Sequence, residues 1–326
     1  MQKTLKLLLA LSAAMLFSCQ TENRNPLLPN ISGAAGEVIV VMQKSLWEGG
    51  TGSEMRVRLA YDYGILPQEE PAFDLIFIPP DGFSNMFKLN RNIIIAKVKS
   101  TADSAMFAAK NDIWAKPQLV MEIIAPDTVS LTDFIKLNGP KMASLMEDAE
   151  RNRIMASFKA NQNKTISDQL QRNHHINLIV PSNFNIDVDS NNFVWMSHET
   201  PEISQSILIY HYPYEEGNSF TKSFLISKRN EICKAYVPGP NQGSYMGTER
   251  DELVDFNEFG YKGRYIAYLK GLWKLENGGF MGGAIYQYLY PGHNKKPSSY
   301  NRRFRLRPQK GKAQPDKAVR SHIAYF

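Results

Sequence analysis

Two stretches of this chain share one pattern, and that pattern constrains the fold more than any other feature. Phe73–Val98 and Ile207–Val237 each begin with an apolar run and continue through a Phe-rich segment to an Arg-Asn pair. These pairs are Arg91-Asn92 and Arg229-Asn230. A recurring pattern of this kind is typical of internal duplication. The sequence therefore predicts two diverged repeats.

Short apolar runs bounded by Pro, Gly and Asn predict strands in both halves. In the first half these runs are residues 36–42, 73–78, 93–98 and 118–124. In the second half they are residues 176–180, 184–188, 193–198, 207–212, 265–275 and 281–290. Helical periodicity marks residues 133–161, with a break at Gly139-Pro140, and residues 219–233. Many strands with few helices favour an α+β fold, in which each repeat is a mostly antiparallel sheet with packed helices.

The N-terminus reads as an export signal. Met1–Cys19 has Lys3 and Lys6, then an apolar run, and it ends in Leu-Phe-Ser-Cys. This run is too short for a spanning helix that stays in the membrane. The ending resembles the lipobox of bacterial lipoproteins, which implies cleavage before Cys19 and lipidation of that residue. A plain secretory signal is the alternative. Gln20 after the Cys resembles lipoproteins sent to the outer membrane, and residues 20–35 predict a flexible tether.

The positive charge of the chain comes from its C-terminal segment. The net charge is +6, yet residues 295–326 hold ten Lys or Arg and one acid, Asp316. Residues 1–294 therefore hold 28 basic and 31 acidic side chains. A basic patch on the body of the protein, which nucleic-acid binding requires, is not expected. Nucleic acid is excluded as a partner on this ground.

The basic segment also differs from the rest of the chain in pattern. It contains Pro308 and Pro315 and shows neither helical nor strand periodicity. Codons can be chosen for residues 303–325 such that reading them one nucleotide later gives a different amino-acid sequence. That sequence has the pattern of a strand, a Pro turn and an amphipathic helix. We therefore predict a frameshift near Gly292–Lys296 and a poorly packed tail over residues 295–326. A native solvated tail is the alternative.

Several short motifs resemble those of a known family. They are LPQEEPAFD at Leu66–Asp74, GSYM at Gly243–Met246, GLW at Gly271–Trp273 and MGG at Met281–Gly283. Together they resemble an uncharacterised envelope lipoprotein family of Bacteroidota, a domain of unknown function. The resemblance implies a lipid-anchored envelope protein. With Gln20, the expected location is the outer membrane, facing the periplasm. It implies no catalytic residue. The expected domains are residues 36–165 and 174–294, after residues 1–19 and 20–35.

No residue cluster of the sequence predicts a cofactor or a metal. His174, His175, His198 and His211 lack a recurrent ligand spacing. Cys233 is the only Cys besides Cys19, and it is expected to be a buried structural thiol. The glycines at Gly49–Gly52 precede a helix but lack the Lys of a phosphate-binding loop.

Two functions from different classes remain open. The first is a non-catalytic binding or assembly module for an envelope protein or a glycan, anchored to the membrane by lipid. Loop aromatic residues and the two Arg-Asn pairs are the candidate surface for it. That surface comprises Trp47, Arg91, Asn92, Arg229, Asn230, Tyr245 and Trp273, with Tyr63, Tyr212 and Tyr214 as further aromatic anchors. The alternative is an envelope hydrolase or transferase with a site between the two repeats.

Overall fold

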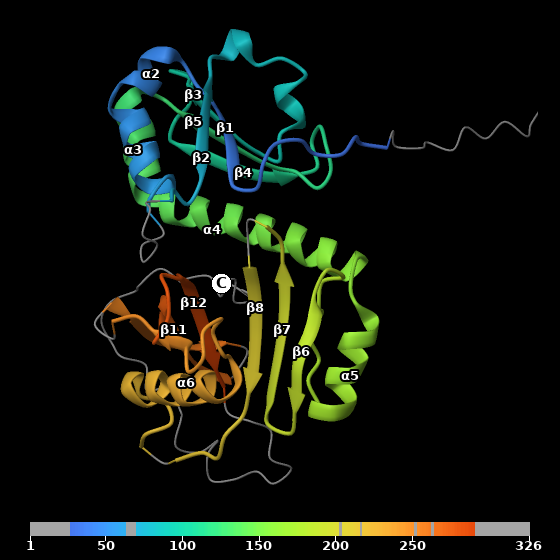
Figure 1. Ribbon diagram of the computed structural model, residues 1–326. Coiled ribbons are helices and arrows are strands. Elements are labelled where there is room, and N and C mark those ends of the chain that lie inside the picture. The colour runs from blue at the N-terminus through green and yellow to red at the C-terminus, as the bar shows by residue number, and fades with distance from the viewer. Residues whose placement is uncertain are drawn as a thin grey trace, which may run out of the picture.

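The computed structural model describes residues 27–62, 70–201, 204–215, 217–250, 253–261 and 264–290. The predicted leader with Cys19, residues 20–26 of the predicted tether, Tyr63 and the tail from Lys295 lie outside these residues. The described chain is a mixed α/β structure with three sheets and five α-helices (Figure 1). We call residues 27–160 the first half and residues 161–290 the second half.

The first half is built around one five-stranded sheet. Its elements in chain order are β1 (Glu37–Val41), α2 (Lys44–Glu48), α3 (Gly50–Leu59), β2 (Asp74–Ile78), the 3-10 turns Pro80–Gly82 and Phe87–Leu89, β3 (Asn92–Val98), β4 (Met106–Asn111), β5 (Leu119–Ala125) and α4 (Thr128–Ala160). The strand order is β2-β1-β3-β5-β4. All neighbouring pairs are parallel except β4 with β5.

The four strands predicted for this half are confirmed, but the antiparallel sheet predicted for it is wrong. Central strands of a parallel sheet are covered on both faces and so are apolar almost throughout. The stretches EVIVV in β1, NIIIA in β3 and LVMEIIA in β5 have this composition. Helices α3 and α4 cover one face, over Val40, Ile94 and Met121. The two 3-10 turns and Trp114 cover the other.

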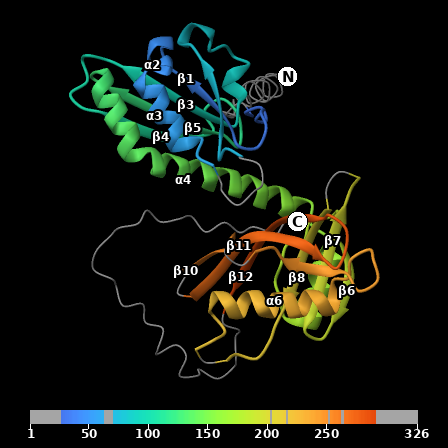
Figure 2. The ribbon, with the colours of Figure 1, turned by 60° about the vertical axis from the view of Figure 1, so that its left-hand side comes forward.

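Helix α4 connects the two halves (Figures 1 and 2). Its 33 residues span roughly 50 Å. Asp127 caps its first turn, because the carboxylate accepts a hydrogen bond from the Ser130 amide at 2.7 Å. The break predicted at Gly139-Pro140 is absent, since burial of one face of α4 holds this stretch helical. Among the described residues, no helix is both long and apolar enough to cross a membrane.

The second half contains two smaller antiparallel sheets. Its elements are α5 (Lys164–His174), β6 (Asn185–Ser190), β7 (Phe193–Glu199), β8 (Ser204–Tyr210), α6 (Lys222–Tyr236), β9 (Tyr245–Thr248), β10 (Asp255–Tyr261), β11 (Arg264–Glu276) and β12 (Gly282–Leu289). One sheet has the order β6-β7-β8. The other has the order β10-β11-β12, and β9 pairs with the far end of β11. The antiparallel prediction is therefore confirmed for this half.

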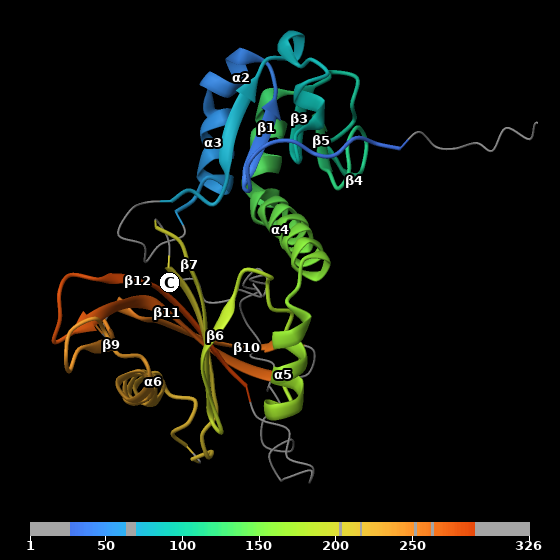
Figure 3. The ribbon, with the colours of Figure 1, turned by 45° about the vertical axis from the view of Figure 1, so that its right-hand side comes forward.

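The sheet β6-β7-β8 lies between the two helices of this half. Alternation along β7 sends Val194 and Met196 toward α5 and sends Phe193 and Trp195 toward α6. Figure 3 shows α5 and α6 on opposite sides of this sheet. Helix α6 also covers one face of the β10-β11-β12 sheet through Leu225 and Ile226. It is thus the central packing element of the second half.

The structure does not show the predicted duplication. Strand β2 pairs in parallel with β1, whereas β8 pairs antiparallel with β7. Arg91-Asn92 stands at the start of a strand, whereas Arg229-Asn230 lies within helix α6. Trp114 lies in a loop and Trp273 within β11. The shared pattern reflects similar local composition, because strand direction and pairing depend on contacts distant in sequence.

Candidate functional site

The predicted binding surface is divided between the two halves. Three of its residues belong to the first half: Trp47, Arg91 and Asn92. The other four, Arg229, Asn230, Tyr245 and Trp273, come together around strand β9 in the second half. The seven residues therefore do not form one surface, and each group has its own structural role.

Trp47 closes one edge of the first core. Its ring stacks on Phe77, with centroids 5.3 Å apart and planes 8° from parallel. The Arg56 guanidinium lies 4.6 Å from the ring centroid on a cation–π contact. The indole is partly buried against the core, so Trp47 is not the free aromatic anchor that the sequence suggested.

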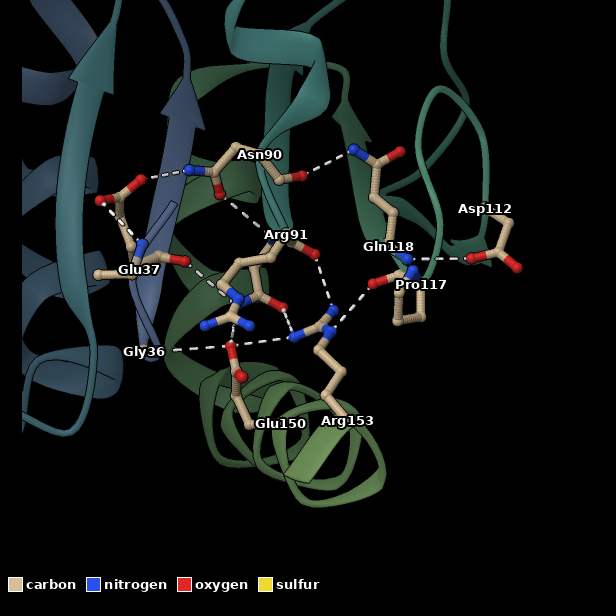
Figure 4. A network of polar contacts seen from close by, with 11 residues as sticks. Gly36, Glu37, Asn90, Arg91, Asp112, Pro117, Gln118, Glu150 and Arg153 are labelled. Atoms are coloured by element: carbon tan, nitrogen blue, oxygen red, sulfur yellow. Dashed lines mark hydrogen bonds and ion pairs between the residues drawn. The ribbon is translucent and has the colours of Figure 1, made fainter. Parts of the chain in front are cut away.

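Arg91 and Asn92 belong to a polar network at the amino ends of the parallel strands (Figure 4). Its centre is Glu150 of α4, whose Oε1 accepts hydrogen bonds from Asn92 Nδ2 at 2.8 Å and from the Gly36 amide at 3.4 Å. The same oxygen forms ion pairs with Arg153 at 2.9 Å and with Arg91 Nε at 3.4 Å. The carboxylate thus joins α4 to β1 and β3.

Arg153 extends this network across the ends of β3 and β5. Its guanidinium donates to Asn92 Oδ1 at 3.0 Å and to the carbonyl oxygens of Arg91 and Pro117 at 2.8 and 2.9 Å. Burial lowers the pKa of Arg153, and the negative charge of Glu150 opposes that shift. The network satisfies backbone groups that the sheet leaves unpaired. Its geometry is that of a structural clamp for α4.

The second group fastens helix α6 to strand β9. Asn230 Oδ1 accepts from the Thr248 amide at 2.9 Å and from the Thr248 hydroxyl at 2.8 Å. Arg229 donates through Nη1 to the same hydroxyl at 3.1 Å. Tyr245, at the other end of β9, lies under the Lys234 ammonium, which is 5.4 Å from its ring centroid. These side chains serve the helix–sheet interface.

Three of the four short motifs named above meet at the same place, whereas the fourth, Leu66–Asp74, belongs to the first half. GSYM lies at the start of β9, GLW lies in β11, and MGG begins β12. Trp273 is opposite Thr248 on one side and opposite Gly283 on the other. A Cβ atom at Gly283 would lie 2.7 Å from Trp273 Nε1, so glycine is needed where the indole passes. These three motifs therefore support packing of the β9-β11-β12 end.

The turn between β11 and β12 presents an apolar tip, which we define as Asn277–Met281. Phe280 is fully exposed and Met281 is half exposed. The Leu275 amide donates to the Met281 carbonyl at 2.9 Å, which closes the turn behind Phe280. Asn277 has φ 53° and donates to the Gly243 carbonyl at 3.4 Å. The tip is thus held by the β9 loop while its largest side chain faces water.

The sequence predicts the turn between these strands, but it does not predict that Phe280 and Met281 are exposed there. ENGGFM contains the Asn-Gly signal of a tight turn. Whether Phe280 and Met281 are buried depends on what packs over the end of the hairpin, which has no local signature. Of the predicted loop aromatics, Tyr212 is half buried with Lys228 above its ring, and Tyr214 lies against Phe220.

Two side chains that could act as nucleophiles, Cys233 and Ser244, are engaged in packing or in a turn. Cys233 is fully buried, and burial raises the pKa of its thiol. The Ser244 hydroxyl donates to the Asn241 carbonyl at 2.6 Å and accepts from the Asn241 amide at 3.0 Å, which closes the turn before β9. Among the described residues, neither group is hydrogen-bonded to a base that would activate a nucleophile.

The four histidines that were considered as metal ligands do not form a metal site. Within the described residues, no group of three His, Cys, Asp or Glu side chains is placed to hold a metal ion. His174 Nε2 lies 2.6 Å from Asp189 Oδ1, and Gln169 and Asn173 donate to the other carboxylate oxygen. Burial alone raises the pKa of Asp189, but the hydrogen bonds from Gln169, His174 and Asn173 outweigh it and lower that pKa. This cluster fastens the end of α5 to β6.

A shallow groove of about 410 Å³ runs between α5 and the extended segment that follows it. It is lined by Gln162, Ser167, Asp168, Gln171, Asn177, Leu178 and Ile179. Asp168 is the one ionisable side chain in this lining. The other polar residues of the lining are Gln162, Ser167, Gln171 and Asn177, and the Ser167 hydroxyl accepts a hydrogen bond from the Val180 amide at 3.4 Å.

Two domain models match the chain, one for each half. Residues 32–174 match a domain of unknown function, DUF8532, and residues 163–314 match a second domain of unknown function, DUF4837. The two matches overlap along α5. No curated protein and no solved structure matches the chain. Two different models for the two halves agree with their different sheets, and the chain is therefore similar to two distinct domains of unknown function joined in sequence.

Proposed function

We propose that this chain is a lipid-anchored envelope protein that acts as a non-catalytic binding module. Support for the anchor is the lipobox-like ending at Cys19, and support for the outer membrane is Gln20. The orientation toward the periplasm is part of the proposal. The observation that carries the binding role is the exposed tip Asn277–Met281. In this proposal the tip is the point at which a partner docks.

The tip has the properties of an anchor for an apolar pocket. Burying a Phe side chain that is fully exposed contributes roughly 2–3 kcal/mol to binding. Met281 adds a flexible, polarisable side chain that adapts to irregular surfaces. The loop is already held by the Leu275–Met281 and Asn277–Gly243 hydrogen bonds, so little conformational entropy is lost on docking.

The partner that fits this tip is a protein with an apolar pocket. Phe280 and Met281 carry no side-chain hydrogen-bond donor, whereas recognition of a glycan relies on polar groups beside an aromatic ring. Aromatic residues and Met are enriched at protein–protein interfaces. The tethered position near a membrane also brings lipid within reach, and the experiment below separates lipid from protein.

Site-specific photo-crosslinking in intact envelopes tests the proposal. A photoreactive amino acid at position 280 is expected to form one dominant protein adduct, which mass spectrometry identifies. The same probe at position 137 is the control, because Leu137 is also highly exposed but lies on α4 of the first half. Adducts with lipid alone, or the same adducts from both positions, would contradict a protein-docking role for the tip.

The variant Phe280→Ser complements the crosslinking. It is expected to lose co-purification of the crosslinked partner while keeping the unfolding midpoint of the unmodified protein, because the side chain makes no buried contact. Leu137→Ser is the matched control and is expected to keep the partner. Unchanged co-purification in Phe280→Ser would show that the tip contributes nothing to binding.

A further inference from the structure

Arg229 is a buried cation at the interface between α6 and the β9–β12 sheet. Only 3% of its surface is exposed. Its Nη1 donates to the Thr248 hydroxyl at 3.1 Å, but its Nη2 is buried without a hydrogen-bond partner. Among the ion pairs of the described residues none includes Arg229, in contrast to Arg91 and Arg153 beside Glu150. Within the part of the chain that the structure describes, this positive charge therefore has no anionic partner.

Two ionisable neighbours of Arg229, Tyr210 and Cys233, do not supply negative charge. Burial raises the pKa of the Tyr210 phenol, and the charge of Arg229 opposes that shift without overcoming it. Burial raises the pKa of the Cys233 thiol in the same way. Both groups are therefore neutral at pH 7. An isolated ion in an apolar interior is unfavourable by several kcal/mol, unlike an ion that has a counter-charge.

Arg229 is one of the residues that line a small cavity. The cavity has a volume of about 10 Å³. Its lining is Ile226, Arg229, Thr248, Val254, Leu269, Gly271 and Ile285. Space of this size holds about one water-sized particle. A carboxylate or a phosphate does not fit without rearrangement of the surrounding side chains.

We propose that this cavity is a binding site for a single-atom anion, and that chloride is its ordinary occupant. Chloride would accept a hydrogen bond from the unpaired Nη2 and would neutralise the charge of Arg229. A water molecule could accept the same hydrogen bond but would carry no charge. The apolar lining and the closeness of α6 to β11 make the site selective by size. The anion would thereby stabilise the α6–sheet interface.

Thermal unfolding at constant ionic strength tests this site in the full-length protein. Chloride is exchanged stepwise for gluconate, which is too large for the cavity. Above the dissociation constant, each tenfold rise in chloride is expected to raise the ratio of folded to unfolded protein about tenfold. The unfolding midpoint should then rise by roughly 3–5 °C for each such step. Equal midpoints in chloride and gluconate would overturn the proposal.

Two variants assign the effect to Arg229. Arg229→Met removes the charge and is expected to abolish the chloride dependence. Arg250→Met removes an arginine whose side chain is 72% exposed, and it should keep that dependence. If Arg229→Met does not fold, crystals of the unmodified protein grown in bromide decide the question. An anomalous peak beside Nη2 supports the site, and an ordered water at that position refutes it.

Discussion

Replacing Glu150 with Ala is expected to destabilise the first half strongly. The carboxylate is largely buried, and it is the acidic partner of both Arg91 and Arg153. Its removal also leaves the Gly36 amide without its side-chain acceptor. Removing one member of a buried ion pair costs roughly 3–5 kcal/mol, because the remaining charges stay buried. With about 2–4 °C per kcal/mol for a domain of this size, the unfolding midpoint should fall by roughly 10 °C.

Asp148→Ala is the matched control for this experiment. Asp148 lies on the same helix and pairs with Arg151 at 2.8 Å, but its side chain is 51% exposed. An exposed pair of this kind contributes about 1 kcal/mol or less. Glu150→Gln keeps an oxygen acceptor and should fall between the two variants. Differential scanning calorimetry and urea titration measure the series. If Glu150→Ala lost no more stability than Asp148→Ala, the interpretation of this network as a clamp would be wrong.

Three further predictions address the anchor, pH dependence and one close contact. Cys19→Ser should release the protein from membranes or block its processing, and a variant that still fractionates with the outer membrane would contradict lipidation. Asp189 has a lowered pKa in the folded state, so its contribution to the free energy of unfolding is present above its unfolded pKa of about 3.9 and is lost as the pH falls through the folded pKa. The stability difference between the unmodified protein and Asp189→Asn, measured in urea, should therefore shrink as the pH falls from 6 toward 3, and a constant difference would contradict this. Gly52→Ala should lose about 3 kcal/mol, because a Cβ would lie 2.0 Å from the Trp47 carbonyl oxygen, whereas Gly50→Ala has open space and should change little in the same titration.

Local pattern was enough to place most secondary structure of this protein. The strands β1, β2, β3 and β5 follow from short apolar runs bounded by turn residues. The hairpin β6–β7 follows from alternating residues around Asp-Ser-Asn-Asn, and α6 follows from its helical periodicity. The burial of Cys233 was also correctly expected. These features depend on neighbours in sequence, and so a single sequence is sufficient to predict them.

Strand direction and the partners of polar side chains were decided by tertiary structure. Apolar runs such as β3 suit a parallel or an antiparallel neighbour, and only the crossover through α2 and α3 sets β1 parallel to β2. Arg91 was predicted to belong to a binding surface, whereas its side chain pairs with Glu150, which is supplied by a helix far along the chain. Phe280 faces water because nothing in the described residues packs over the end of the β11–β12 hairpin. Long-range packing makes these choices, and two stretches with the same local pattern, Phe73–Val98 and Ile207–Val237, can therefore adopt different folds.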